Sequence, residues 1–228
     1  MSARARTAVL ISGRGSNLQA LIDACTATTF PAEVVCVISN VPEAEGLARA
    51  GRARIATRTL AHGAFASREH FDSAIEACLH EFEVRLVCLA GFMRVLSDRF
   101  VEDWRGRLVN IHPSLLPAFK GLNVHRRVLE AGVRISGCTV HFVVPELDSG
   151  PIIAQAAVPV LPQDTEESLA RRTLEAEHKI YPFALGLLAQ NRVRLEGGRV
   201  LSDVESHGGE RLFSPHLRSG ESGDTGGA

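Results

Sequence analysis

TAVLISGRGSNLQALIDAC, residues 7–25, joins two apolar runs of different periodicity through a glycine-containing turn. The first run, 7–12, is short and rich in β-branched residues, which is typical of a buried strand. In the second run, Leu18, Leu21 and Ile22 recur at helical spacing. A strand that leads directly into a helix is the building unit of a parallel sheet. The stretch therefore predicts an α/β fold with the glycine turn at the carboxyl end of its first strand.

The same alternation continues along the chain. Strand-like apolar runs lie at 34–39, 86–90, 108–112, 135–144 and 152–160, and helical patterns lie at 44–50, 67–82 and 164–188. Ser67 is the expected N-cap of its helix, and Asp164 with Glu167 forms a capping-box pattern. We predict a doubly wound, mostly parallel sheet with helices on both faces, a Rossmann-like α/β fold.

Composition limits the class of protein. The 228 residues, 45% of them apolar, fit one domain. We place it at 1–204, followed by a tail at 205–228 whose last ten residues are expected to be disordered. The net charge of −1 gives no broad attraction to nucleic acid or membranes. Five cysteines without a CxxC pair, and an apolar run at 8–11 too short for a signal peptide, indicate a cytoplasmic protein.

Two short segments, 110–117 and 148–151, supply candidate catalytic residues. Asn110 and His112 are two residues apart, so in a strand they lie on the same face, and Pro113 should end that strand. An amide and an imidazole can stabilise an oxyanion, and Asp148 can hold the imidazole. Each residue alone has an ordinary interpretation as a strand end or turn residue, and their conjunction favours catalysis. No metal is expected, because no histidine or cysteine spacing fits a zinc site.

The turn after the first strand is a candidate phosphate site. Gly15, Ser16 and Asn17 open the first helix, where free N–H groups and the helix dipole attract an anion. Leu18 stands at the third glycine position of the dinucleotide fingerprint, and no Walker Gly-Lys-Ser/Thr follows. The alternative is a plain tight turn in which Ser16 or Asn17 caps the helix.

Taken together, these segments resemble the glycinamide ribonucleotide formyltransferases, within the wider superfamily that uses formyltetrahydrofolate. The matching stretches cover nearly the whole chain except the tail. They are ISGRGSNLQAL at 11–21, SRE at 67–69, LAGFMRVL at 89–96, NIHPSLLP at 110–117, GCTVHF at 137–142, LDSGPII at 147–153 and EHKIYP at 177–182.

The resemblance implies transfer of the formyl group of 10-formyltetrahydrofolate, a co-substrate, to the amine of glycinamide ribonucleotide in purine biosynthesis. It implies no metal and no covalent enzyme intermediate. By matching positions, Gly15, Ser16, Asn17 and Glu177 would bind the ribonucleotide. The folate would meet Arg68, Met93, Arg94, Val95, Leu96 and Asn110. The catalytic residues would be Asn110, His112 and Asp148.

Two alternatives stay open at this point, a deformylase and a noncatalytic nucleotide-binding module. A formyltetrahydrofolate deformylase would pass the formyl group to water, but such proteins resemble this chain with an extra N-terminal domain and His-His-Ser where His112-Pro113-Ser114 stands. A methionyl-tRNA formyltransferase would need a further C-terminal RNA-binding domain. A noncatalytic nucleotide-binding module would have no need of the candidate catalytic residues. Small-molecule substrates are the only expected partners, and the chain should be a monomer or a weak homodimer.

Overall fold

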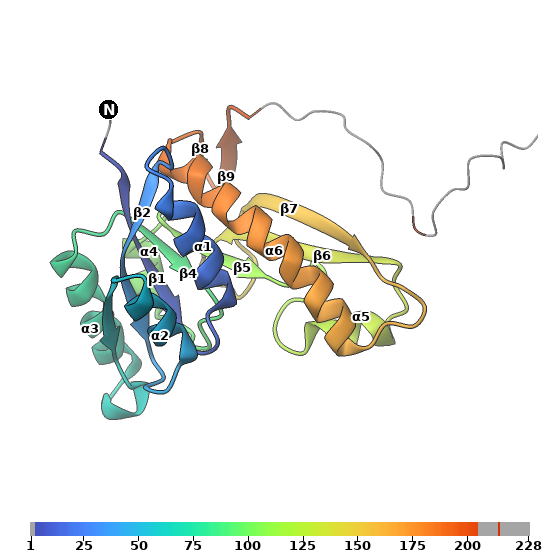
Figure 1. Cartoon of the computed structure of the whole chain (residues 1–228), viewed down its shortest axis with the longest axis horizontal. Coiled ribbons are helices and arrows are strands. Elements are labelled where there is room, and N and C mark those ends of the chain that lie inside the picture. The colour runs from blue at the N-terminus through green and yellow to red at the C-terminus, as the bar shows by residue number, and fades with distance from the viewer. Residues whose placement is uncertain (1–2, 205–213, 215–228) are drawn as a thin grey trace, which may run out of the picture.

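The computed structural model describes residues 3–204 and residue 214, so the expected tail disorder and the domain boundary fall outside what it tests. A seven-stranded sheet forms the centre of the fold, in the order β3-β2-β1-β4-β5-β6-β7 (Figure 1). Its strands are β1 (Ala5–Ile11), β2 (Ala32–Ser39), β3 (Ala56–Thr59), β4 (Leu86–Leu89), β5 (Leu108–His112), β6 (Ile135–Phe142) and β7 (Ile152–Pro159). The first five are parallel, and β6 runs antiparallel to both of its neighbours, β5 and β7. The prediction of a mostly parallel α/β sheet is confirmed.

Helices cover both faces of the sheet (Figure 1). They are α1 (Ser16–Thr26), α2 (Glu45–Arg52), the single turn η1 (His62–Ala64), α3 (Arg68–Glu81), α4 (Asp98–Asp103), α5 (Val124–Glu130) and α6 (Glu166–Ala189). None of the helices within residues 3–204 combines the length and apolar character needed to cross a lipid bilayer.

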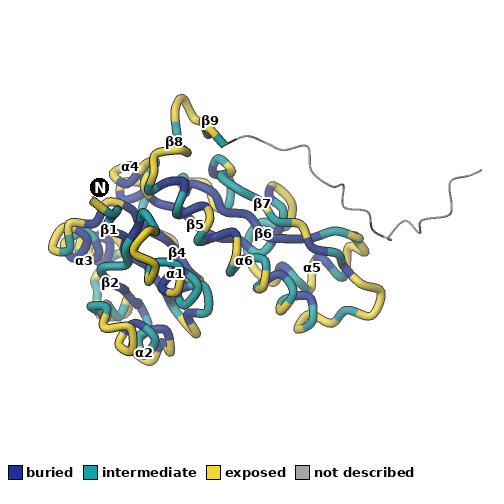
Figure 2. Tube along the Cα trace, turned by 45° about the horizontal axis from the view of Figure 1, so that its top comes forward, coloured by how far each residue is buried: buried dark blue, intermediate teal, exposed yellow. Residues whose placement is uncertain are grey.

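Strand β1 shows why the sheet needs two layers of helices. Val9 and Ile11 pack in the core under α1 and α6, while Ala8 and Leu10 pack in the core under α3 and α4. Alternate residues of a strand point to opposite faces, so a strand that is apolar throughout is buried on both sides. Figure 2 shows this burial along the central strands, with exposed positions gathered on the outer helices and loops.

The ends of most elements follow from local chemistry. The Ser67 hydroxyl accepts the His70 amide at 3.3 Å, which confirms it as the N-cap of α3. The capping prediction for α6 was wrong: the box is formed by Thr165 and Ser168, one position later. Asp164 instead accepts hydrogen bonds from Arg172 at 2.7 and 2.8 Å and from the Ser168 hydroxyl at 2.7 Å, so its carboxylate is bound by side chains and not by a backbone amide of the first helical turn.

The sequence patterns missed several short elements. These are β3, η1, α4, α5 and a separate hairpin of β8 (Val193–Glu196) and β9 (Arg199–Ser202) beyond α6. All five cysteines are free, and all but Cys25 are buried. Burial raises the pKa of Cys36, Cys88 and Cys138 to about 12, so these thiols stay protonated at neutral pH.

Candidate functional site

The sheet topology defines where a ligand can bind. Strand order runs from β1 outward to β2 and β3 on one side and to β4 and β5 on the other, so the direction of winding reverses between β1 and β4. In open α/β sheets the loops at such a switch point, beyond the carboxyl ends of the strands, form the ligand crevice. The candidate phosphate turn follows β1, and the candidate folate turn at 90–96 follows β4. Both substrate turns predicted from sequence therefore follow the two strands at this switch point.

Four polar side chains gather at the end of β5. Asn110 lies opposite His141 in the β5–β6 ladder, and the Asn110 Nδ2 atom is 3.3 Å from His141 Nε2. His112 Nδ1 lies 3.4 Å from the Asp148 carboxylate, and His141 Nε2 lies 3.9 Å from the other oxygen of that carboxylate. The structure thus brings Asn110, His112 and Asp148 together as the sequence predicted, and adds His141.

Hydrogen-bond chemistry assigns the protons of His141. Its Nδ1 is 2.9 Å from the Phe142 carbonyl, which can only accept, so Nδ1 carries the hydrogen. Nε2 is then left to accept from the Asn110 amide. Burial lowers the pKa of His141, which keeps the ring neutral and suited to this acceptor role. One N–H of Asn110 is therefore bound to His141, the amide orientation is fixed, and the second N–H remains for a ligand.

His112 faces acceptors on both sides. Its Nε2 donates to the Phe119 carbonyl at 3.0 Å, and its Nδ1 faces Asp148. The same carboxylate accepts the Gly121 amide at 2.8 Å. A ring that is protonated on both nitrogens satisfies both acceptors. The segment 119–121 therefore lies directly over the two residues expected to move protons.

The turn before that segment is tied to β6 and β7. The Thr139 hydroxyl donates to the Ser114 carbonyl at 2.7 Å and accepts the Leu116 amide at 3.1 Å. Gln155 donates to the same hydroxyl and to the Leu116 carbonyl. Sequence reasoning missed Thr139 and His141, although both lie in the quoted stretch GCTVHF. Two polar residues at alternate positions of an otherwise buried strand were the available signal.

The helix that follows the candidate phosphate turn has no capping side chain. Gly15, with φ of 70°, is the N-cap of α1, and no side chain caps the helix. The ordinary alternative, in which Ser16 or Asn17 caps α1, is therefore not what the structure contains. A Cβ on Gly15 would lie 2.7 Å from the Gly46 Cα, so glycine is required here by the close approach of α2. The amide hydrogens of the first turn of α1 are left without a capping side chain.

Glu177 reaches this turn from α6. The Asn17 amide donates to the Glu177 carboxylate at 2.6 Å, although 160 residues separate them. Glu177 is only 7% exposed, and this burial raises the pKa of its carboxyl group, an effect that the Asn17 hydrogen bond opposes. The pairing brings two of the predicted ribonucleotide residues into contact.

Two basic residues near the turn were not predicted from the sequence. Arg49 on α2 donates from Nε to the Arg14 carbonyl at 2.8 Å. Burial, and then the nearby charge of Arg49, lower the pKa of His178. The buried His178 Nε2 has no hydrogen-bond partner among the described residues. The stretch EHKIYP pointed to the helix that carries His178, whereas nothing in the sequence pattern singled out Arg49.

The folate-side turn presents apolar surface to solvent. Met93 is 68% and Val95 55% exposed, and Arg94 is also exposed. Leu96 differs because its side chain is buried in the core under α3 and α4, so only its backbone could meet a ligand. Arg68 is exposed at the start of α3, one helical turn before Phe71, whose ring stacks on Phe92 at 6.4 Å. This stacking places the start of α3 beside the turn.

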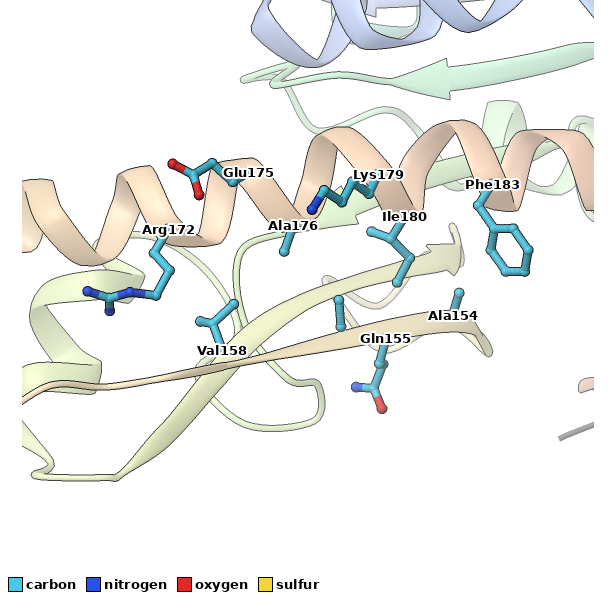
Figure 3. A pocket seen from close by; sticks show the side chains of 10 residues that line it. Ala154, Gln155, Val158, Arg172, Glu175, Ala176, Lys179, Ile180 and Phe183 are labelled. Atoms are coloured by element: carbon cyan, nitrogen blue, oxygen red, sulfur yellow. The ribbon is translucent and has the colours of Figure 1, made fainter. Parts of the chain in front are cut away.

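A separate open groove of about 510 Å³ lies between α6 and β7 (Figure 3). Its lining includes Arg172, Lys179 and Phe183, and none of the candidate site residues. Within residues 3–204, no three histidine, cysteine or acidic side chains cluster as metal ligands would. The candidate chemistry therefore lies at the sheet edge and not in this groove.

A switch point with a glycine turn on one side and an amide–imidazole–carboxylate cluster nearby is typical of α/β group-transfer enzymes. The chain belongs to the formyl transferase family, whose sequence model matches residues 5–185.

Named relatives and solved structures agree with that family. The chain is 49% identical to phosphoribosylglycinamide formyltransferase of Escherichia coli over 190 residues, which cover 82% of this chain and 88% of that protein. It is 54% identical over 198 residues, 86% of its length, to the trifunctional purine biosynthetic protein adenosine-3 of Gallus gallus, of which it spans only 20%. A crystal structure of glycinamide ribonucleotide transformylase 1 from Symbiobacterium toebii superposes with a TM-score of 0.85 at 49% identity, covering 88% of this chain and 94% of that one.

Proposed function

We propose that this protein transfers the formyl group of 10-formyltetrahydrofolate to the primary amine of glycinamide ribonucleotide, as a cytoplasmic enzyme of purine biosynthesis. The observation that carries the proposal is the meeting of Asn110, His112 and Asp148 at the edge of the sheet that also holds the phosphate turn. Relatives that bear the name of this activity match nearly their whole length. A nucleotide and a second substrate can thus occupy one crevice.

The ribonucleotide would bind on the α1 side. Its phosphate would meet the uncapped amides of Ser16 and Asn17 behind Gly15, because a helix N-terminus attracts an anion. Glu177, held by Asn17, would accept hydrogen bonds from the ribose hydroxyls. The folate would lie along residues 92–96, where the exposed side chains of Met93 and Val95 suit the face of a flat ring.

The reaction needs no covalent enzyme intermediate. The amine nitrogen attacks the formyl carbon, the new C–N bond forms, and the carbonyl oxygen takes negative charge. The free N–H of Asn110 and a protonated His112 would donate to that oxygen. The intermediate then collapses as the bond to the folate nitrogen breaks, and the proton lost by the amine reaches the departing nitrogen. Asp148 would hold His112 and relay this proton.

This mechanism requires residues 119–121 to move away from His112. The Phe119 carbonyl occupies the hydrogen-bonding direction of His112 Nε2 that the oxyanion would need. The segment 119–121 must therefore shift when substrates bind, giving up its bonds to His112 and Asp148. Gly121, with φ of 80°, supplies a backbone conformation that few other residues adopt.

The proposal is tested by mixing the purified protein with 10-formyltetrahydrofolate and glycinamide ribonucleotide and following both products. Formation of formylglycinamide ribonucleotide in step with tetrahydrofolate supports it. Absence of the formylated ribonucleotide under conditions where both substrates bind would overturn it.

A further inference from the structure

The two substrate turns are joined by a hydrogen-bonded connection that the proposed chemistry has not used. Ser12 is the first residue after β1, directly before the phosphate turn. Its hydroxyl accepts the Met93 amide of the folate-side turn at 2.7 Å, and its own amide donates to the Gly91 carbonyl at 3.2 Å. One residue on the phosphate side therefore binds the folate side at two points.

Asn40 fixes the direction of this hydroxyl. The Met93 amide can only donate, so the Ser12 oxygen must accept there, and its single proton is free to point elsewhere. That proton goes to the Asn40 Oδ1 atom, 2.5 Å away. Asn40 follows β2 and is only 3% exposed. A buried acceptor thus holds the hydroxyl in the one orientation that suits Met93.

The folate-side turn has few other hydrogen bonds, and its packing contacts lie at Phe92, which stacks on Phe71, and at the buried Leu96. Within residues 3–204, the backbone of 91–96 makes hydrogen bonds to Ser12 alone, and the adjacent bonds lie outside it, from Ala90 to Leu10 and from Ser97 to Asp72. Its central residues are exposed and belong to no helix or strand. Packing holds the turn against α3, whereas its hydrogen bonds to the phosphate side are made by Ser12.

The phosphate side of the connection is also held in place. The Gly46 amide at the start of α2 donates to the Gly13 carbonyl at 3.1 Å. The turn 12–15 is thus bound to α2 on one side and to the folate-side turn on the other. A shift of either substrate turn is passed to the other through residue 12.

We propose that Ser12, oriented by Asn40, is a positioning residue that sets the separation of the two substrate turns and couples the binding of the two substrates. This inference rests on the proposed function. The amine on one turn must approach the formyl carbon on the other to near bonding distance, and a misplacement of about 1 Å can cost roughly 100-fold in rate. Ser12 touches neither reacting atom, so its effect is on alignment.

The test compares Ser12→Ala with Ser12→Thr, which keeps the hydroxyl, and with the control Thr7→Val. Thr7 lies toward the other end of β1 and is buried, and its hydroxyl donates to the Ala5 carbonyl of the same strand. For each variant, calorimetry gives the Kd for glycinamide ribonucleotide with and without a folate analogue that cannot transfer its formyl group. The ratio of the two Kd values is the coupling between the sites. Steady-state assays and melting temperatures complete the set.

Ser12→Ala is expected to lower kcat by roughly tenfold or more and to bring the coupling ratio close to one. The Kd for each ligand alone should change only slightly. Ser12→Thr should retain most of the coupling, and Thr7→Val should retain all of it. A merely structural role would instead lower the melting temperature while leaving the coupling ratio and the kcat of the folded protein intact.

Two results separate the inference from the function beneath it. A wild-type protein that binds both ligands but makes no formylated ribonucleotide would overturn the proposed function and this inference with it. A wild-type protein that transfers formyl, beside a Ser12→Ala variant with unchanged kcat and unchanged coupling, would overturn the inference alone.

Discussion

Replacing Asn110 by alanine tests whether its side-chain amide acts in catalysis or serves only to stabilise the fold. The substitution removes the N–H expected to meet the oxyanion and also the donor that binds His141 at 3.3 Å. Loss of one oxyanion donor costs about 2.7–4 kcal/mol of transition-state stabilisation, or roughly 100- to 1,000-fold in kcat. We expect a loss of that size in kcat, with much smaller changes in the KM values, because the contact strengthens only as negative charge develops.

The structural cost of the same change is smaller. His141 Nε2 would lose its donor inside a buried site, which costs about 1–3 kcal/mol of folding free energy. For a domain of this size that lowers the melting temperature by roughly 2–12 °C. Rates measured at 25 °C on protein shown to be folded by circular dichroism therefore report chemistry and not unfolding.

Ser136→Ala is the matched control. Ser136 is a buried residue of β6, the strand that carries His141, and its hydroxyl has no partner among the described residues. Removing an unpaired buried hydroxyl should leave both stability and kcat near the wild-type values. An Asn110→Ala protein that is folded and keeps kcat within a few-fold of wild type would refute the oxyanion role.

Three further predictions concern other parts of the site and fold. Glu177→Gln should raise the KM for the ribonucleotide several-fold, yet unfold at the same or a higher temperature at pH 7. Burial raises the pKa of Glu177 in the folded protein, so its carboxyl group makes the fold less stable as pH rises from about 4.3 through the folded pKa. Glutamine carries no charge and avoids this loss. Asp164→Asn should reduce the loss of stability at acid pH, because the hydrogen bond from Arg172 lowers the pKa of Asp164 in the folded protein. The ionised carboxylate stabilises the fold fully above about pH 4, and this stabilisation is lost as pH falls through the folded pKa. Thermal melts that show the same acid loss in the variant would count against this prediction. Gly15→Val should lower the melting temperature and weaken both ligands in calorimetry, since its side chain would meet Gly46; a loss confined to the ribonucleotide would show that α2 adapts.

Periodicity in the sequence was enough to predict the central architecture. Apolar residues are continuous in the buried strands β1, β4 and β5 and regularly spaced in the long helices α3 and α6. These patterns show which faces are buried, and they were enough to predict the five elements. Strand β3, with the sequence ATRT, lies at the edge of the sheet and has no apolar pattern to detect. The helices α4 and α5, with six and seven residues, are too short for a period to be distinguished from chance.

The site was predictable where residue type and spacing carry the chemistry. Asn110 and His112 share a face because they are two apart in a strand, and Pro113 marks its end. The role of His141 depends on the register between β5 and β6, which sets it opposite Asn110 and is invisible before the pairing is known. The contact between Phe119 and His112 involves a backbone carbonyl, so no side-chain identity signals it.

The central claim is that this chain moves a formyl group from folate to an amine and not to water. The direct measurement is the rate of tetrahydrofolate formation from 10-formyltetrahydrofolate, with and without glycinamide ribonucleotide. We predict that product appears only when the ribonucleotide is present and that one formylated ribonucleotide forms for each tetrahydrofolate. Formate released at the same rate without the ribonucleotide would contradict the account and identify a deformylase instead.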